Sequence, residues 1–298
     1  MVGCDGVADA VRPPSASRER EQVAFSSELA SAARRFETPC GAGRMVWHAW
    51  NEGAGPPVVL LHGGNGSWRH WMRTIPHLAA RRHVLAADLP GLGESDLPEG
   101  VETPDAVARI VSEGLRALVP EARHADLVGF SFGAIVGGVV AAGVGADLRN
   151  LVILGAGALG VPRTPTPLER VRDKSGAARI AAHRHNLAAM MIADPARIDD
   201  LAVATQEWHT IHARFRSRGF ASTTLLKDAL ARTTCRIGAA WGELDQVAVP
   251  HVDRRIAAVR EARPDARIAV IPDAGHWAMY EQPEQVNALL DSWLGEGG

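Results

Sequence analysis

The sequence predicts an α/β protein whose mostly parallel sheet is covered by helices on both faces. Short apolar runs at 58–61, 83–87 and 151–154 alternate with helix-like stretches. This alternation is typical of βαβ units and of strands buried on both faces. The rhythm stops between about residues 160 and 233, where helix-like stretches occur without a convincing strand, and it resumes at 236–241. We therefore expect one α/β core that is interrupted once by a helical block.

The composition is that of an ordinary globular protein. The chain has 298 residues, of which 46% are hydrophobic and 22% charged. These proportions exclude a disordered or collagen-like chain. The formal net charge of −2 offers no broadly basic surface to a nucleic acid. A nucleic acid is therefore not expected as a partner, and a homo-oligomer stays open. A small-molecule substrate is expected only from the catalytic motifs described below.

The cysteine pattern and the apolar runs predict the compartment. Three cysteines are scattered along the chain without a CxxC pair, so we expect free thiols in a reducing compartment, with neither a disulfide framework nor a zinc site. No apolar run reaches the roughly 18 residues that a membrane span needs. No secretory signal is visible at the N-terminus. The expected location is cytoplasmic, without a membrane as partner.

The expected domain boundaries follow from these changes in pattern. Residues 1–42 are rich in Ser, Arg, Glu and Ala and are expected to form an N-terminal extension. Within it, the spacing of apolar residues over 18–36 favours one amphipathic helix. Residues 43–158 and 234–298 are expected to form the core, and 159–233 the helical block.

A serine in a sharp turn is the strongest candidate nucleophile. Residues 129–133 read Gly-Phe-Ser-Phe-Gly and match G-x-S-x-G between a predicted strand and a predicted helix. Such a turn lifts the Oγ atom of Ser131 above the sheet, and it needs residues with almost no side chain two positions away on each side. The alternative is a glycine-rich turn with a solvated serine, but the strand–turn–helix context favours a nucleophile.

A base and an orienting acid should follow, because a serine hydroxyl alone is a poor nucleophile. In folds with this turn the order along the chain is serine, acid, histidine. Asp245 and His276 follow the last two predicted strands, so both should reach the carboxyl edge of the sheet beside Ser131. Glu243 and Asp273 are the rivals for the acid, and we expect them to order their loops instead.

Two backbone N–H groups are expected to stabilise the developing oxyanion. One should belong to Phe132, the residue after the nucleophile. The other should come from the glycine-rich loop after the strand at 58–61, where we favour Gly64 and place Asn65 second. His62 in the same loop is expected to brace the loop, not to act in catalysis.

With these motifs, the chain resembles the α/β-hydrolase family over roughly residues 44–298. The resemblance rests on five motifs in family order: His62-Gly63-Gly64, the turn at 88–95, Gly-Phe-Ser-Phe-Gly at 129–133, Trp-Gly-Glu-Leu-Asp at 241–245 and Ala-Gly-His-Trp at 274–277. The family implies an eight-stranded, mostly parallel sheet with a helical cap inserted after the sixth strand. It also implies a catalytic Ser131, His276 and Asp245 with no cofactor and no metal.

The resemblance further implies the class of reaction. Relatives that cleave carbon–halogen bonds or epoxides use an aspartate in the sharp turn, whereas this chain has Ser131. A carboxylic ester hydrolase is therefore expected. The alternative is a C–C bond hydrolase of aromatic ring-fission products, the 2-hydroxy-6-oxo-dienoates. Residues 275–278 are similar to that group, in which the Trp after the histidine lines the substrate site. Trp277 and Phe130 are accordingly expected to contact substrate.

The sequence leaves several further possibilities open and argues against a nucleotide site. A non-catalytic ligand receptor and a thioesterase or other acyltransferase remain as alternatives on the same fold. Residues 155–160 match the dinucleotide pattern G-x-G-x-x-G, but Pro162 interrupts the helix that would hold the pyrophosphate, so no nucleotide cofactor is expected. Five cap arginines could clamp a substrate carboxylate: Arg179, Arg184, Arg214, Arg216 and Arg218.

Overall fold

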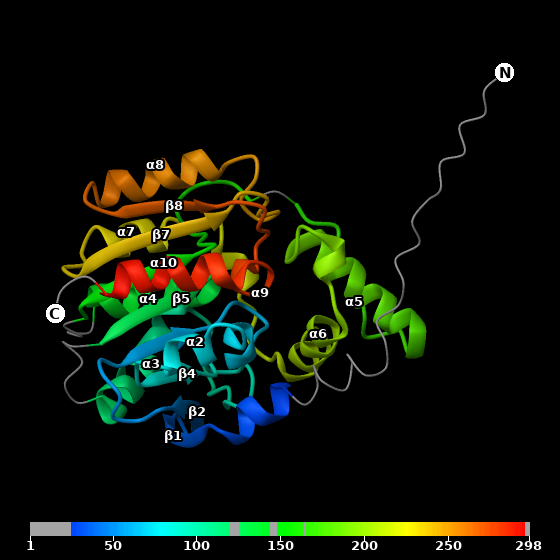
Figure 1. Ribbon diagram of the computed structural model, residues 1–298, viewed down its shortest axis with the longest axis horizontal. Helices are drawn as coiled ribbons and strands as arrows, with labels where there is room; N and C mark the ends of the chain where they lie inside the picture. Colours follow the sequence, from blue (N-terminus) through cyan, green and yellow to red (C-terminus); the bar gives the residue numbers. More distant parts are fainter. Residues whose placement is uncertain (1–24, 120–124, 144–147, 164, 296–298) are drawn as a thin grey trace.

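One sheet runs through the core of the molecule (Figure 1). The computed structural model describes residues 25–119, 125–143, 148–163 and 165–295. Within this part of the chain, eight strands pair in the order β1-β2-β4-β3-β5-β6-β7-β8. β2 pairs antiparallel with β1 and β4, and the other neighbours are parallel. The strands are β1 (Arg34–Cys40), β2 (Gly43–Trp50), β3 (Val58–Leu61), β4 (Val84–Ala87), β5 (Asp126–Phe130), β6 (Asn150–Leu154), β7 (Arg236–Gly242) and β8 (Arg267–Ile271).

The sheet separates two hydrophobic cores, because successive strand side chains point to opposite faces. In β3, Val59 and Leu61 face one core, whereas Val58 and Leu60 face the other. This arrangement confirms the predicted α/β class with helices on both faces. The first core is closed by α3 (Pro104–Leu118), α4 (Phe132–Gly143), α7 (Leu225–Leu230) and α8 (Val252–Ala262). The second is closed by the 3-10 helix η1 (Trp68–Trp71), α2 (Ile75–Ala79), α9 (Ala278–Glu281) and α10 (Pro283–Gly295).

The start of α3 follows a local signal in the sequence. Thr103 before Pro104 predicts a helix start, and the Thr103 side-chain oxygen accepts a hydrogen bond from the backbone N–H of Ala106. The sequence pattern also predicts one helix over 68–78, but this stretch forms the two helices η1 and α2. The Ser67 hydroxyl caps η1 by accepting the backbone N–H of Arg69, and η1 ends at Met72.

The N-terminal boundary differs from the expectation. Residues 25–31 are helical, but the chain then enters β1 at Arg34, so the helix expected over 18–36 ends early. β1 pairs along its whole length with β2, from Arg34 opposite Ala49 to Cys40 opposite Gly43. The core therefore begins before residue 43. Residues 1–24 of the expected extension lie outside the described residues.

The helical block divides between two roles. α5 (Gly176–Met190) and α6 (Asp200–His212) stand beyond the ends of the strands, with the 3-10 helices η3 (Pro195–Arg197) and η4 (Arg218–Phe220) (Figure 1). α7 instead packs on α4, where the Leu226 side chain lies so close to Gly138 that a Cβ atom there would be 2.3 Å from it. The cap is thus narrower than 159–233, because its last helix belongs to the core layer. None of the helices in the described segments is long and apolar enough to cross a membrane.

Candidate active site

The turn between β5 and α4 holds Ser131 in a strained conformation. Ser131 has a φ of 50°, a left-handed conformation that is uncommon for residues other than glycine. Its backbone N–H donates to the Leu154 carbonyl at 2.8 Å, which ties the turn to β6. A Cβ atom on Gly129 would lie 2.4 Å from the Gly133 carbonyl oxygen, and one on Gly133 would lie 2.2 Å from that of Leu61. Both positions therefore require glycine, as the motif predicts.

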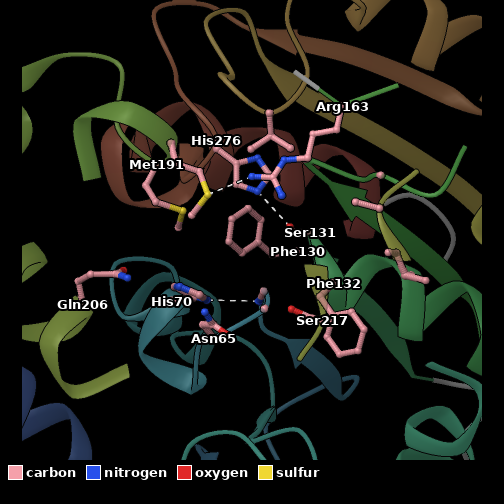
Figure 2. A pocket seen from close by; sticks show the side chains of 18 residues that line it. Asn65, His70, Phe130, Ser131, Phe132, Arg163, Met191, Gln206, Ser217 and His276 are labelled. Atoms are coloured by element: carbon pink, nitrogen blue, oxygen red, sulfur yellow. Dashed lines mark hydrogen bonds between the residues drawn. The ribbon is translucent and has the colours of Figure 1, made fainter. Parts of the chain in front are cut away.

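Three side chains from three strand ends meet in one hydrogen-bonded line. The Oγ atom of Ser131 lies 3.0 Å from Nε2 of His276 (Figure 2). Nδ1 of His276 lies 2.9 Å from Oδ2 of Asp245. Asp245 is fully buried, and its second carboxylate oxygen accepts the backbone N–H groups of Val247 and Ala248. Because an ionised carboxylate only accepts, Nδ1 donates and Nε2 is left to accept from Ser131.

The two rival acids lie elsewhere. A carboxylate oxygen of Glu243 accepts the backbone N–H of Asp273 at 3.3 Å, and the carbonyl of Asp273 accepts from Gln282. The Glu243 carboxylate thus orders the loop after β8, whereas Asp273 takes part in these bonds through its backbone. Neither of them makes a described hydrogen bond to His276, whose Nδ1 atom faces Asp245.

The residues expected at the oxyanion site border the same cavity as Ser131. Phe132 is the first residue of α4, so its N–H has no partner within the helix. Gly64 lies beside both Phe132 and Ser217, and a Cβ atom there would lie 2.0 Å from the Ser217 hydroxyl. Asn65 follows with a φ of 52°. Gly64, Asn65, Phe132 and Ser131 all line one cavity of about 90 Å³.

Two buried histidines fix the loop that carries Gly64. His62 donates from Nδ1 to the Gly63 carbonyl at 2.7 Å, and its Nε2 accepts the N–H of Leu89 at 2.9 Å. Burial lowers the pKa of His62 to about 4, so the ring is neutral. Nδ1 of His70 accepts the N–H of Gly63 at 3.2 Å. Burial is the main cause that lowers the pKa of His70 well below 6.5. His62 thus braces the loop, as expected.

The cavity wall also contains residues whose place in the site is not predicted by the sequence. Gly155 stands against the ring of His276, and a Cβ atom there would lie 3.1 Å from that ring. His70 lines the wall opposite, while Arg163 and Gln206 reach the cavity from the helical block (Figure 2). The glycine of G-x-G-x-x-G at 155 is therefore a site residue, although not for a nucleotide. No local signal marks the other three, because only long-range packing brings them to Ser131.

The two aromatic residues expected to contact substrate have different positions. Phe130 lines the cavity, with its ring 4.9 Å from that of His276. Trp277 is fully buried and is absent from the cavity wall within the described residues. Its indole N–H donates to the His70 carbonyl at 2.8 Å, and its ring stacks on Tyr280. The expectation for Trp277 is corrected accordingly: it supports the backbone of His70 from behind.

The fold and the site together define the class of protein. An eight-stranded sheet, a serine in a sharp turn after the fifth strand, and a buried Asp–His pair at the ends of the last two strands make up the architecture of an α/β-hydrolase. The sequence model of the alpha/beta hydrolase family matches residues 58–289. The chain belongs to that family and is an enzyme of the hydrolase class.

Individual relatives cover most of the chain. The acetyltransferase component of the acetoin cleaving system of Pseudomonas putida is 29% identical over 292 residues, which span 93% of this chain and 74% of that protein. The 2-hydroxy-6-oxo-6-phenylhexa-2,4-dienoate hydrolase of Burkholderia cepacia is 27% identical over 268 residues, 84% of this chain and 91% of the relative. The crystal structure of carboxylesterase CesB from Bacillus subtilis matches with a TM-score of 0.72 at 18% identity, covering 95% of this chain and 100% of that one.

Proposed function

We propose that the protein hydrolyses carboxylic esters of small molecules. The observation that carries this proposal is the line from Asp245 through His276 to Ser131, which ends at a cavity. In this role Ser131 is the nucleophile, His276 the general base and acid, and Asp245 the group that orients the imidazole.

The reaction would proceed through an acyl-enzyme. The Oγ atom of Ser131 attacks the ester carbonyl while Nε2 of His276 takes its proton. The carbonyl oxygen becomes an oxyanion near the backbone N–H groups of Phe132 and Gly64. The C–O bond then breaks, and His276 returns the proton to the departing alcohol. Water attacks the acyl-enzyme in the same way, so that the carboxylic acid and free Ser131 result.

The size of the cavity favours an ester with a short group beside the carbonyl. Its volume of about 90 Å³ is well below the roughly 300–1,000 Å³ of pockets that enclose a larger ligand. Its wall mixes apolar groups, such as Ile135 and Met191, with a few polar ones. A wall of this kind is typical of sites for small, mostly apolar ligands.

A second candidate function is hydrolysis of a C–C bond in a ring-fission product. The observation in its favour is Arg163, whose guanidinium reaches the cavity wall and lies 3.4 Å from the sulfur of Met190 (Figure 2). A guanidinium suits a carboxylate such as that of a dienoate. The relative from Burkholderia cepacia is named for a substrate of this type. Trp277 does not line the described cavity wall, so it adds no support for this function.

Purified wild type and Ser131→Ala should be compared on phenyl acetate and on a 2-hydroxy-6-oxo-dienoate. We expect phenyl acetate turnover to fall at least about 1,000-fold in the variant, because the nucleophile is lost. The exposed Ser222 provides a matched control, and Ser222→Ala should keep the wild-type rate. Equal rates in wild type and Ser131→Ala would refute the proposal. Dienoate turnover far above ester turnover would support the second candidate.

A further inference from the structure

A second, larger hollow adjoins the Ser131 cavity. It has a volume of about 850 Å³ and lies against the helical block. Four residues line both spaces: Asn65, Met190, Gln206 and Ser217. Figure 2 shows Asn65, Gln206 and Ser217 on the side of the inner cavity away from His276. A substrate bonded to Ser131 would therefore leave the inner cavity past these residues and enter what we call the outer cleft.

The outer cleft is cationic. Arg170 and Arg172 line it from the stretch before α5, and Arg214 and Arg216 from the stretch after α6. The one carboxylate among its lining residues belongs to Glu169, which forms a 2.9 Å ion pair with Lys174. The chain as a whole carries a formal charge of −2, so this concentration of positive charge is local.

Two arginines of the helical block have carboxylate partners and lie away from the cleft. Arg179 pairs with Glu207, and Arg184 pairs with Asp200. Neither of these paired arginines is part of the cleft wall among the described residues.

The arginines of the cleft wall have a different environment. The exposed side chains of Arg170, Arg172 and Arg216 form no ion pair with a carboxylate in the described part of the chain. Arg214 donates to the carbonyl oxygen of Ser95 at 2.5 Å, which fixes its position without neutralising its charge. Four arginines without a carboxylate partner in the described part of the chain thus gather at the exit from the Ser131 cavity.

We propose that the outer cleft is a binding site for an anionic group, phosphate or carboxylate, at the far end of the ester substrate. The inner cavity has a volume of only about 90 Å³, so most of a larger substrate must lie in the cleft. Guanidinium groups bind phosphate and carboxylate oxygens through paired hydrogen bonds. This inference rests on the proposed ester hydrolysis and adds the substrate class.

Two pairs of esters test the proposal by steady-state kinetics. Phenyl acetate and 4-acetoxyphenyl phosphate differ by a phosphate on the leaving group. Phenyl butyrate and monophenyl succinate differ by a carboxylate on the acyl group. We expect the anionic member of one pair to have a KM about tenfold below its neutral partner at low salt, and the preference to vanish near ~0.5 M salt. The pair that responds identifies which side of the ester lies in the cleft.

The charges are tested by a triple variant, Arg170→Gln with Arg172→Gln and Arg216→Gln. It should raise the KM of the preferred anionic ester about tenfold and leave that of the neutral ester unchanged. The matched control replaces three exposed arginines on α3 and α8: Arg109, Arg254 and Arg260. An anionic preference in neither pair, or an equal loss in the control triple, would overturn the proposal.

Binding to Ser131→Ala separates this proposal from the proposed function. 4-Hydroxyphenyl phosphate and succinate are the hydrolysis products that carry the added phosphate or carboxylate of each pair. Calorimetry measures their affinity without turnover. If no ester is hydrolysed, the proposed function fails. The cleft proposal would then still be supported by binding of either product that weakens about tenfold in the triple arginine background. It would be refuted if both products failed to bind or bound equally with and without the three arginines.

Discussion

At the scale of single residues, the surroundings of Asp245 distinguish it from Glu243, which is only two positions away. The Asp245 carboxylate is buried and receives two backbone N–H groups, so it stays in place to accept from His276. Glu243 instead meets the backbone of Asp273 at a partly exposed loop. The two carboxylates thus have different roles, because the turn of the chain after β7 buries Asp245 and leaves Glu243 exposed.

This difference predicts opposite outcomes for two isosteric changes. Asp245→Asn should lower kcat for phenyl acetate by about 10³- to 10⁴-fold, because the amide would favour the wrong tautomer of His276. Glu243→Gln should change kcat less than about threefold, since an exposed loop bond is lost. Steady-state kinetics with both proteins checks the pair. Similar losses in the two variants would show that the acid has been assigned wrongly.

The sequence predicts the three residues of the hydrogen-bonded line in the active site, but it does not predict the whole cavity wall. Ser131, Asp245 and His276 follow from local motifs together with the rule that parallel strands end at one sheet edge. Trp277 follows His276 directly, yet it points behind His70, because that direction depends on packing between distant segments. His70 itself carries no local signal for a place at the cavity wall.

At the scale of elements, the two glycines of the serine turn are limited by backbone atoms. A Cβ atom on Gly133 would meet the carbonyl oxygens of Leu61 and His62, which cannot move without displacing β3. Gly133→Ala should therefore destabilise the fold by at least about 2 kcal/mol and abolish esterase activity. Gly143→Ala, at the other end of α4, meets no atom within 4 Å and should change stability by less than about 1 kcal/mol. Urea unfolding measures both, and a well-folded, active Gly133→Ala protein would contradict this account.

The elements that the sequence predicts well are those buried on both faces. β3 and β4 are apolar at every position, so the sequence predicts them as short apolar runs. The sequence does not predict β1 as a strand, because β1 lies at the sheet edge and exposes Arg34, Arg35 and Glu37. Its charged residues resemble those of a solvated helix. Only its pairing with β2 shows that it is a strand.

At the scale of the whole molecule, buried histidines make stability depend on pH. Four lie at or near the second core and are at most 6% exposed: His48, His62, His70 and His209. Burial is the main cause that lowers the pKa of each, to about 4 for His48 and His62. The unfolded chain, with a histidine pKa near 6.5, takes up more protons as the pH falls. The stability is therefore complete above about pH 6.5 and is lost progressively toward pH 4.

One carboxyl group opposes this trend. Asp88 is fully buried, and burial raises its pKa to about 6, although the backbone N–H groups of Glu94 and Trp68 lower it in part. Between about pH 6 and pH 4 the folded protein therefore binds this proton more readily than the unfolded chain does, which favours the fold as the pH falls. A single carboxyl group offsets only part of the loss from four imidazoles.

The free energy of unfolding should consequently fall between pH 7.5 and pH 5, by roughly 2 kcal/mol for each of His48 and His62 before the Asp88 offset. Urea titrations at both pH values measure this difference. In His48→Phe the imidazole of β2 is gone, so the drop should shrink by roughly 2 kcal/mol, whatever the variant's stability at pH 7.5. The exposed His185 provides the control, and His185→Phe should keep the wild-type drop. A drop of the same size in all three proteins would show that buried imidazoles do not set the acid limit of the fold.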